Sequence, residues 1–185
     1  MTKSLTKDKL ILFDTTLRDG QQTQGVDFSV QDKINIAQAL DDMGIDYIEG
    51  GWPGANPSDT KFFEKNNHFQ NAKFTAFGMT KRAGRSADND PQLRALIDSN
   101  SDSVCLVAKT WDFHVDLALG ISLEENIDAI KDSITSVRSG GKEAMIDCEH
   151  FFDGFKSNPS FSYQCIQTSI DAGAEWVILC DTNGG

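Results

Sequence analysis

The segment Phe13-Asp14-Thr15-Thr16-Leu17-Arg18-Asp19-Gly20-Gln21-Gln22 joins a hydrophobic run to charged residues and a glycine. The run, residues 10–13, is too short for a helix and is typical of a buried strand. Ligands of parallel α/β folds bind beyond the carboxyl ends of the strands, because the loops there converge on one cavity. We therefore expect Arg18 and Asp19 to lie at a functional site. An adjacent Arg–Asp pair taken alone is more often a surface ion pair of little energetic weight.

The remaining sequence alternates short apolar runs with helical patterns. A helix that begins after the capping box of Ser29 and Asp32 should bury one face and stop at Gly44. That face would carry Val30, Ile34, Ala37, Leu40 and Met43. Four further helices are expected after the capping residues Asn56, Asp90, Ser122 and Asn158. Strands are expected at 10–13, 47–49, 73–77, 104–107, 144–147 and 176–180, and a loop at 149–158.

Six alternations of strand and helix predict an α/β protein with a parallel sheet. An open doubly wound sheet and an eight-fold barrel both accept this pattern, and a barrel typically needs about 250 residues. No G-x-G-x-x-G follows the first strand, and the chain stops after a strand without a covering helix. We therefore predict a (β/α)8 TIM barrel truncated after about six βα units. Residues 10–185 would form the N-terminal part of the catalytic barrel, preceded by a disordered lead-in at 1–9.

Composition limits the possible functions. The 185 residues suffice for one domain with a sizeable core, and no run approaches the roughly 20 apolar residues of a membrane span. The net charge of −11 disfavours nucleic-acid binding, because it repels polyanions. The four cysteines show no C-x-x-C spacing, and the N-terminus does not resemble a secretory signal. We expect a cytoplasmic protein that binds neither nucleic acid nor membranes.

Several residues have side chains suited to catalysis or binding. Asp19 beside a strand end is a hard oxygen donor suited to Mg²⁺ or Mn²⁺, and Arg18 is a permanently charged donor. Glu49 ends the second strand and is as well explained by solvent exposure as by a site role. Glu149 belongs to a cluster of two carboxylates and a histidine at the end of the fifth strand. The cationic loop 80–85 is better explained as solvated than as a phosphate site.

Three segments resemble one enzyme family. Asp14 to Gln22 matches D-T-T-L-R-D-G-x-Q, the signature of the metal-dependent acyltransferase and lyase barrels. This family includes the 2-isopropylmalate, homocitrate and citramalate synthases and hydroxymethylglutaryl-CoA lyase. Residues 50–57, G-G-W-P-G-A-N-P, and 149–154, E-H-F-F-D-G, resemble the citramalate-synthase branch of the family. The family's H-x-H metal-binding motif does not occur in the chain, whose His68, His114 and His150 lack ligand spacing.

The resemblance implies a condensation of acetyl-CoA with pyruvate that yields (R)-citramalate and CoA, with a divalent metal as cofactor (Mg²⁺ or Mn²⁺, with Zn²⁺ as the alternative). It implies that Asp19 binds the metal, that Arg18 is catalytic and binds substrate, and that Glu149 is catalytic. Gln22, Glu49 and Thr182 would bind substrate. The full-length enzyme is expected to be a homodimer. A sister synthase that uses another keto acid, a lyase running the reverse cleavage, and an inactive barrel fragment with open strand edges are the alternatives.

Overall fold

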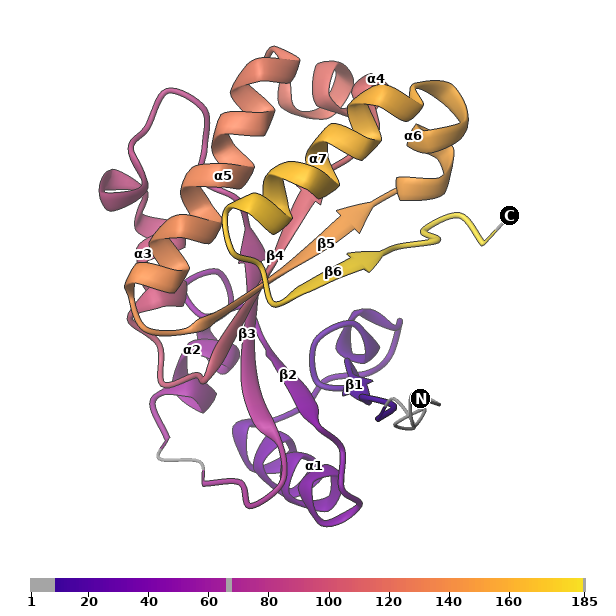
Figure 1. Cartoon of the computed structure of the whole chain (residues 1–185). Coiled ribbons are helices and arrows are strands. Elements are labelled where there is room, and N and C mark those ends of the chain that lie inside the picture. The colour runs from indigo at the N-terminus through magenta and orange to yellow at the C-terminus, as the bar shows by residue number, and fades with distance from the viewer. Residues whose placement is uncertain (1–8, 66–67, 185) are drawn as a thin grey trace, which may run out of the picture.

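The computed structural model describes residues 9–65 and 68–184. Its centre is one sheet of six parallel strands in the order β1-β2-β3-β4-β5-β6 (Figure 1). The strands are β1 (Phe13–Asp14), β2 (Tyr47–Gly51), β3 (Lys73–Met79), β4 (Ser103–Lys109), β5 (Glu143–Glu149) and β6 (Trp176–Leu179). Each strand pairs with the next one along the chain, whereas a doubly wound sheet requires a reversal of strand order. The barrel prediction is therefore confirmed over the doubly wound alternative.

The helices that connect the strands begin at the predicted capping residues. Ser29 and Ser122 each form a reciprocal capping box with the acidic residue three positions later. Side chains of Asn56, Asp90 and Asn158 accept backbone N–H groups of the first turn. The five helices are α1 (Val30–Asp42), α2 (Pro57–Phe63), α3 (Pro91–Ile97), α5 (Leu123–Ser139) and α7 (Pro159–Asp171). Short helical turns occur at η1 (Gly20–Gln22), η2 (Ala87–Asn89), α4 (Asp112–His114), η3 (Val115–Leu119) and α6 (Phe151–Ser157).

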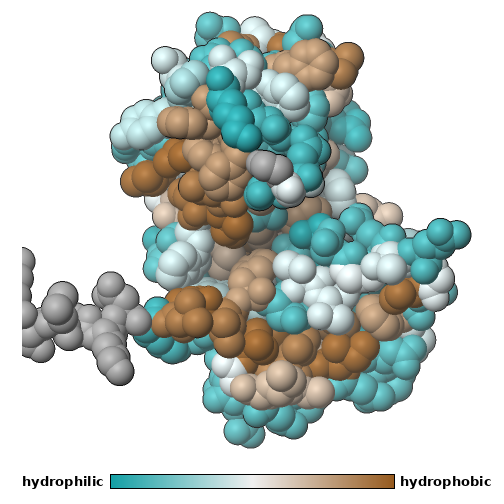
Figure 2. Space-filling view, turned by 90° about the vertical axis from the view of Figure 1, so that its right-hand side faces the viewer, coloured by the Kyte–Doolittle hydropathy of each residue, from teal (hydrophilic) through white to brown (hydrophobic). Residues whose placement is uncertain are grey.

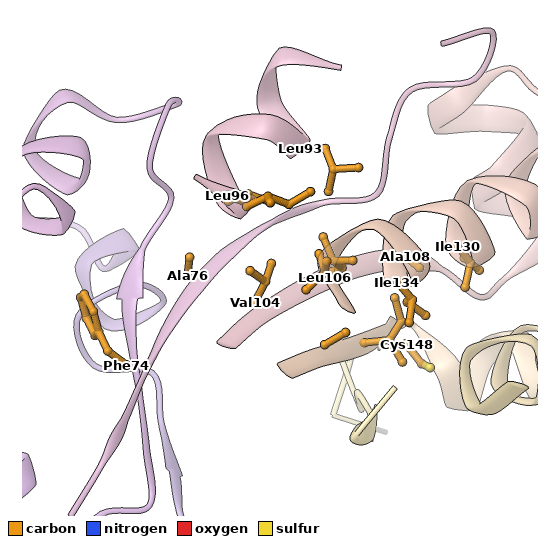
Figure 3. Close-up of a cluster of buried hydrophobic side chains, with 14 of the residues drawn as sticks. Phe74, Ala76, Leu93, Leu96, Val104, Leu106, Ala108, Ile130, Ile134 and Cys148 are labelled. Atoms are coloured by element: carbon orange, nitrogen blue, oxygen red, sulfur yellow. The ribbon is translucent and has the colours of Figure 1, made fainter. Parts of the chain in front are cut away.

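The main hydrophobic core lies between the sheet and the helices on its outer face. Successive side chains of a strand point to opposite faces, so Val104, Leu106 and Ala108 of β4 all face outward. They meet Leu93 and Leu96 of α3 and the aliphatic face of α5 (Figure 3). The helices therefore cover one face of the sheet, and the ends of the strands remain available for a functional site.

The inner face of the sheet is curled. The Tyr47 hydroxyl of β2 donates to Glu143 Oε2 on β5 at 2.9 Å and accepts from Trp176 Nε1 on β6 at 3.1 Å. Three strands separate β2 from β6 in sheet order, so a flat sheet would keep these side chains apart. Figure 2 shows hydrophobic side chains gathered around a hollow on the side where β1 and β6 lie. An apolar cavity of about 320 Å³ between Phe13, Tyr47 and Trp176 marks the open interior of this partial barrel.

The first strand is shorter and less buried than predicted. Leu10 is 77% exposed, and the ladder with β2 covers only Phe13 and Asp14. Within the described residues β1 pairs only with β2, so no strand lies on the other side of the residues before Phe13. The prediction of a buried strand over 10–13 is wrong for this reason. The last strand, β6, lies at the opposite edge of the sheet and ends at Leu179, one residue before its predicted end.

Residues 149–158 are not a loop. His150 adopts a left-handed backbone conformation with φ of 52°, and α6 begins directly after it. Helix α6 packs closely on the chain after β4, because a Cβ atom on Gly154 would lie 2.6 Å from the Thr110 carbonyl oxygen. The predicted lead-in at 1–9 falls, apart from Lys9, outside the described residues. No helix in the described part of the chain is long and apolar enough to cross a membrane.

Candidate active site

A cavity of about 690 Å³ opens at the carboxyl ends of the strands. Five of the predicted site residues line it: Arg18, Asp19, Gln22, Glu149 and Thr182. They come from the loop after β1, the end of β5 and the segment after β6. Glu49, the sixth predicted residue, lies beneath Arg18 and contacts it. The structure thus gathers residues from opposite ends of the sequence, Arg18 and Thr182, at one end of the barrel.

Arg18 is held from three sides. Its Nε donates to Glu49 Oε2 at 2.6 Å, and its Nη1 donates to Asp19 Oδ1 at 3.0 Å. The guanidinium carbon lies 3.9 Å from the centroid of the Phe77 ring, which fits a cation–π contact. The Arg18 side chain is 16% exposed and faces the cavity. A guanidinium group has five N–H donors, so donors remain for a ligand after these contacts.

Glu49 is fully buried, so its interpretation as a solvated strand end is wrong. Burial raises the pKa of its carboxyl to about 7, even though the charge of Arg18 acts to lower that pKa. Oε1 is buried and has no hydrogen-bond partner among the described residues. The Glu49 carboxylate therefore orients Arg18, although the burial of its own charge is energetically unfavourable.

Lys33 fixes the loop that carries Arg18. Its fully buried Nζ donates to the Leu17 carbonyl at 2.7 Å, to the Gly50 carbonyl at 2.9 Å and to Asp59 Oδ1 at 2.5 Å. Asp59 Oδ2 in turn accepts the Trp52 N–H at 2.8 Å. One ammonium group thus ties the residue before Arg18 to the end of β2 and to α2. No sequence pattern indicates this contact, because a lysine in an amphipathic helix normally points to solvent.

Glu149 forms an ion pair with Lys109 across neighbouring strands, whose register pairs these two residues. The Thr182 Oγ1 accepts the His150 N–H at 2.9 Å, which leaves the hydroxyl proton available to another acceptor. Asp147 lies on the same face of β5 as Glu149 and also lines the cavity. The sequence analysis did not assign Lys109 or Asp147 to the site. Counting back by two from Glu149 along the strand would have identified Asp147.

Asp19, the predicted ligand of a hard divalent cation, lies on the wall of this cavity. Its side chain is 62% exposed, and oxygen-bearing side chains of Glu149, Asp181 and Thr182 line the same cavity. Oxygen donors of this kind suit Mg²⁺ and Mn²⁺. The rings of His114 and His150 pack on each other with centroids 4.5 Å apart, and neither residue lines the cavity.

Sequence comparisons identify the family of the chain and its similar proteins. The HMGL-like family model matches residues 9–185. The chain is 49% identical over 180 residues to (R)-citramalate synthase of Aquifex aeolicus, covering 96% of the chain and 34% of that protein. It is 48% identical to (R)-citramalate synthase of Streptomyces coelicolor, with the same coverage. A 2-isopropylmalate synthase of Listeria innocua is 36% identical over 95% of the chain and 33% of its own length. The chain therefore spans about a third of the length of the curated relatives it matches.

Solved structures agree on the fold. Hydroxymethylglutaryl-CoA lyase of Bacillus subtilis superposes with a TM-score of 0.78 at 16% identity, covering 96% of the chain and 59% of that structure. The enzyme of Pseudomonas aeruginosa superposes with a TM-score of 0.72 at 20% identity, covering 94% of the chain and 58% of that structure. The family model over residues 9–185 shows that the chain belongs to the HMGL-like family, and the solved structures agree on the fold.

Proposed function

We propose that this chain supplies the keto-acid site of an acyltransferase that condenses acetyl-CoA with pyruvate to (R)-citramalate and CoA. The observation that carries the proposal is the convergence of Arg18, Asp19, Glu149 and Thr182 on one cavity. Relatives named (R)-citramalate synthase are 44 to 49% identical to the chain, whereas relatives named 2-isopropylmalate synthase are 35 to 36% identical. This difference favours pyruvate over the bulkier keto acids of the sister synthases.

Arg18 would stabilise the charge that develops during the condensation. A base removes a proton from the methyl group of acetyl-CoA, the carbon left with the electron pair forms a bond to the keto carbon of pyruvate, and the keto oxygen becomes negatively charged. Water then hydrolyses the citramalyl thioester and releases CoA. The free guanidinium donors face the cavity in which that oxygen would lie. Glu49 and Phe77 hold the guanidinium in place before the substrate arrives, so little reorganisation is needed. A divalent cation bound at Asp19 would supply Lewis-acid polarisation of the same keto group.

Thr182, Gln22 and Glu149 would position the keto acid. The Thr182 hydroxyl can donate its proton to the pyruvate carboxylate, because Oγ1 already accepts the His150 N–H. Gln22 lies on the cavity wall beside Arg18 and can add an amide donor. Glu149 would hold or move a proton at its carboxylate, which forms an ion pair with Lys109.

Acetyl-CoA would approach from the side of β3. A second cavity, of about 440 Å³, shares Trp52 and Met79 with the first and is also lined by Lys81 and Arg82. Lys81 is only 9% exposed, so the expectation of a solvated cationic loop is wrong for this residue. Arg82, together with Lys81, which also pairs with Asp132 at 3.3 Å, places positive charge beside the keto-acid cavity and fits a phosphate-bearing thioester in a protein of net charge −11. We further propose that the complete enzyme acts as a homodimer in the cytoplasm, where its four cysteines stay reduced.

The proposal can be tested in a chimera in which residues 9–185 replace the corresponding N-terminal segment of the Aquifex aeolicus relative. CoA release from acetyl-CoA is followed with a thiol reagent in the presence of pyruvate, 2-ketoisovalerate or 2-ketoglutarate. We expect release to be fastest with pyruvate. The unaltered relative serves as the control for assay conditions, and a thermal melt shows that the chimera is folded. A folded chimera that releases no CoA with any keto acid, or that cleaves a 3-hydroxyacyl-CoA instead, would overturn the proposal.

A further inference from the structure

Beneath Arg18, three potential metal ligands from three different strands meet inside the barrel. Glu49 of β2, Cys105 of β4 and Asp147 of β5 each offer a ligand atom, and these atoms all lie within 4.8 Å of one another. Their side chains share the inner face of the sheet, because Cys105 packs with Tyr47 and Met145 there and Glu49 and Asp147 follow Tyr47 and Met145 by two residues. Glu49 and Cys105 are fully buried, and Asp147 is half-buried where it meets the cavity. A cation could therefore enter this group from the cavity.

One of these ligand groups has a free oxygen. Arg18 engages Oε2 of Glu49, while Oε1 is buried and lacks a hydrogen-bond partner among the described residues. An uncompensated carboxylate oxygen in a protein interior is costly, and such groups are normally paired or coordinate a metal. Burial also raises the pKa of Glu49, Asp147 and Cys105. Arg18 alone therefore does not fully stabilise the ionised forms of these groups, and a cation bound among them would stabilise those forms.

The donor types indicate which cation fits. A thiolate with two carboxylates is a mixed soft and hard set, which suits Zn²⁺ or Co²⁺ and is poorly suited to Mg²⁺. When Cys105 loses its proton to bind, the three ligands carry three negative charges. One divalent cation and Arg18 supply three positive charges, so the buried group becomes neutral. Three protein ligands and one water from the cavity would complete a tetrahedral site.

We propose that Glu49, Cys105 and Asp147 form a second metal site, selective for Zn²⁺-like cations and separate from the hard-cation site at Asp19. Binding replaces the Cys105 S–H bond by a metal–sulfur bond and releases one proton to solvent. The cation binds the free Oε1 of Glu49, so Arg18 can keep its contact with Oε2. The proposal depends on the geometry of this group and not on the reaction proposed for the chain.

The test uses Co²⁺ as a spectroscopic probe of the reduced 185-residue chain. We expect near-ultraviolet sulfur-to-cobalt charge-transfer absorption that saturates at one Co²⁺ per chain and is abolished by added Zn²⁺. Cys105→Ser should remove the absorption. Asp147→Asn and Glu49→Gln should each weaken Co²⁺ binding by roughly tenfold or more. Two variants serve as controls and should retain the absorption: Cys180→Ser, which alters another cysteine at the cavity, and Asp19→Asn, which alters the hard-cation site.

Circular dichroism of each variant shows whether it is folded. If Cys105→Ser does not fold, Glu49→Gln and Asp147→Asn still test the proposal, because both keep the thiol and remove a carboxylate charge. Absence of sulfur-to-cobalt absorption from the folded wild-type chain at saturating Co²⁺ would overturn the proposal. So would absorption that both carboxylate variants retain at full affinity, or absorption that is lost in Cys180→Ser.

Discussion

The Arg18 Nε donates to Oε2 of Glu49 at 2.6 Å, which joins the loop after β1 to the buried end of β2. Glu49 is fully buried, and the guanidinium also contacts Asp19 and the Phe77 ring. The group that would stabilise negative charge is therefore rigid before any ligand binds. In this contact the Glu49 carboxylate lies inside the barrel, where its burial affects the free energy of unfolding.

Glu49 should make the chain less stable as the pH rises from about 4.5 to about 7. Its pKa is raised from 4.5 to about 7 in the folded state, so the folded chain binds more protons than the unfolded chain in this range. The cost is roughly 3 kcal/mol in the free energy of unfolding, fully present above pH 7. Urea unfolding of wild type and Glu49→Gln at pH 5 and 7.5 measures it. The variant should lose this part of the pH dependence, and equal slopes for both proteins would contradict the assignment.

Lys33→Met should destabilise the chain by about 3 to 5 kcal/mol, because it leaves the Asp59 carboxylate buried without its cation. The free energy of unfolding in urea is the measurement. Arg94→Ala is the matched control, since the Arg94–Asp98 pair is an exposed contact between neighbouring turns and should contribute less than about 1 kcal/mol. Similar losses for both variants would show that Lys33 does not hold the loop before Arg18.

Gly154→Ala should lower the melting temperature, whereas Gly20→Ala should change it little. A Cβ atom at residue 154 would lie 2.6 Å from the Thr110 carbonyl oxygen and 2.8 Å from the Trp111 Cα, both parts of the backbone. At residue 20 the nearest atom would lie at 3.7 Å, an ordinary contact. Overpacking of this kind costs about 1 to 3 kcal/mol. A thermal melt that ranks the two variants in the opposite order would refute the close packing of α6 on the chain after β4.

Local sequence signals predicted much of the fold. The capping residues identified the starts of the five connecting helices, since a cap depends only on residues within one turn. The wrong predictions occurred where tertiary contacts override the local sequence pattern. Met43, expected on the buried face of α1, is 75% exposed. Lys33 of the same helix is buried, because Asp59 and two backbone carbonyl groups accept hydrogen bonds from its ammonium group. Partners from elsewhere in the chain cannot be read from a helical period.

The candidate site was predicted where a charged residue directly follows a strand. Arg18, Asp19 and Glu149 lie at or just beyond strand ends, and all three line the cavity. Asp147 was missed because it lies within β5, two residues before Glu149. Lys109 was missed because β4 was expected to end at residue 107, whereas it extends to Lys109. The burial of Glu49 depends on the curl of the sheet, which the sequence pattern does not specify.

The most direct test of the account is the steady-state kinetics of Arg18→Ala and Arg18→Lys in the Aquifex aeolicus chimera with pyruvate and acetyl-CoA. We expect kcat to fall by roughly 10²- to 10³-fold in both variants, because neither alanine nor lysine supplies the fixed fork of guanidinium donors. The KM for acetyl-CoA should change little, since Arg18 does not line the second cavity. A kcat within about threefold of the unsubstituted chimera would contradict the central claim that Arg18 stabilises the developing oxyanion.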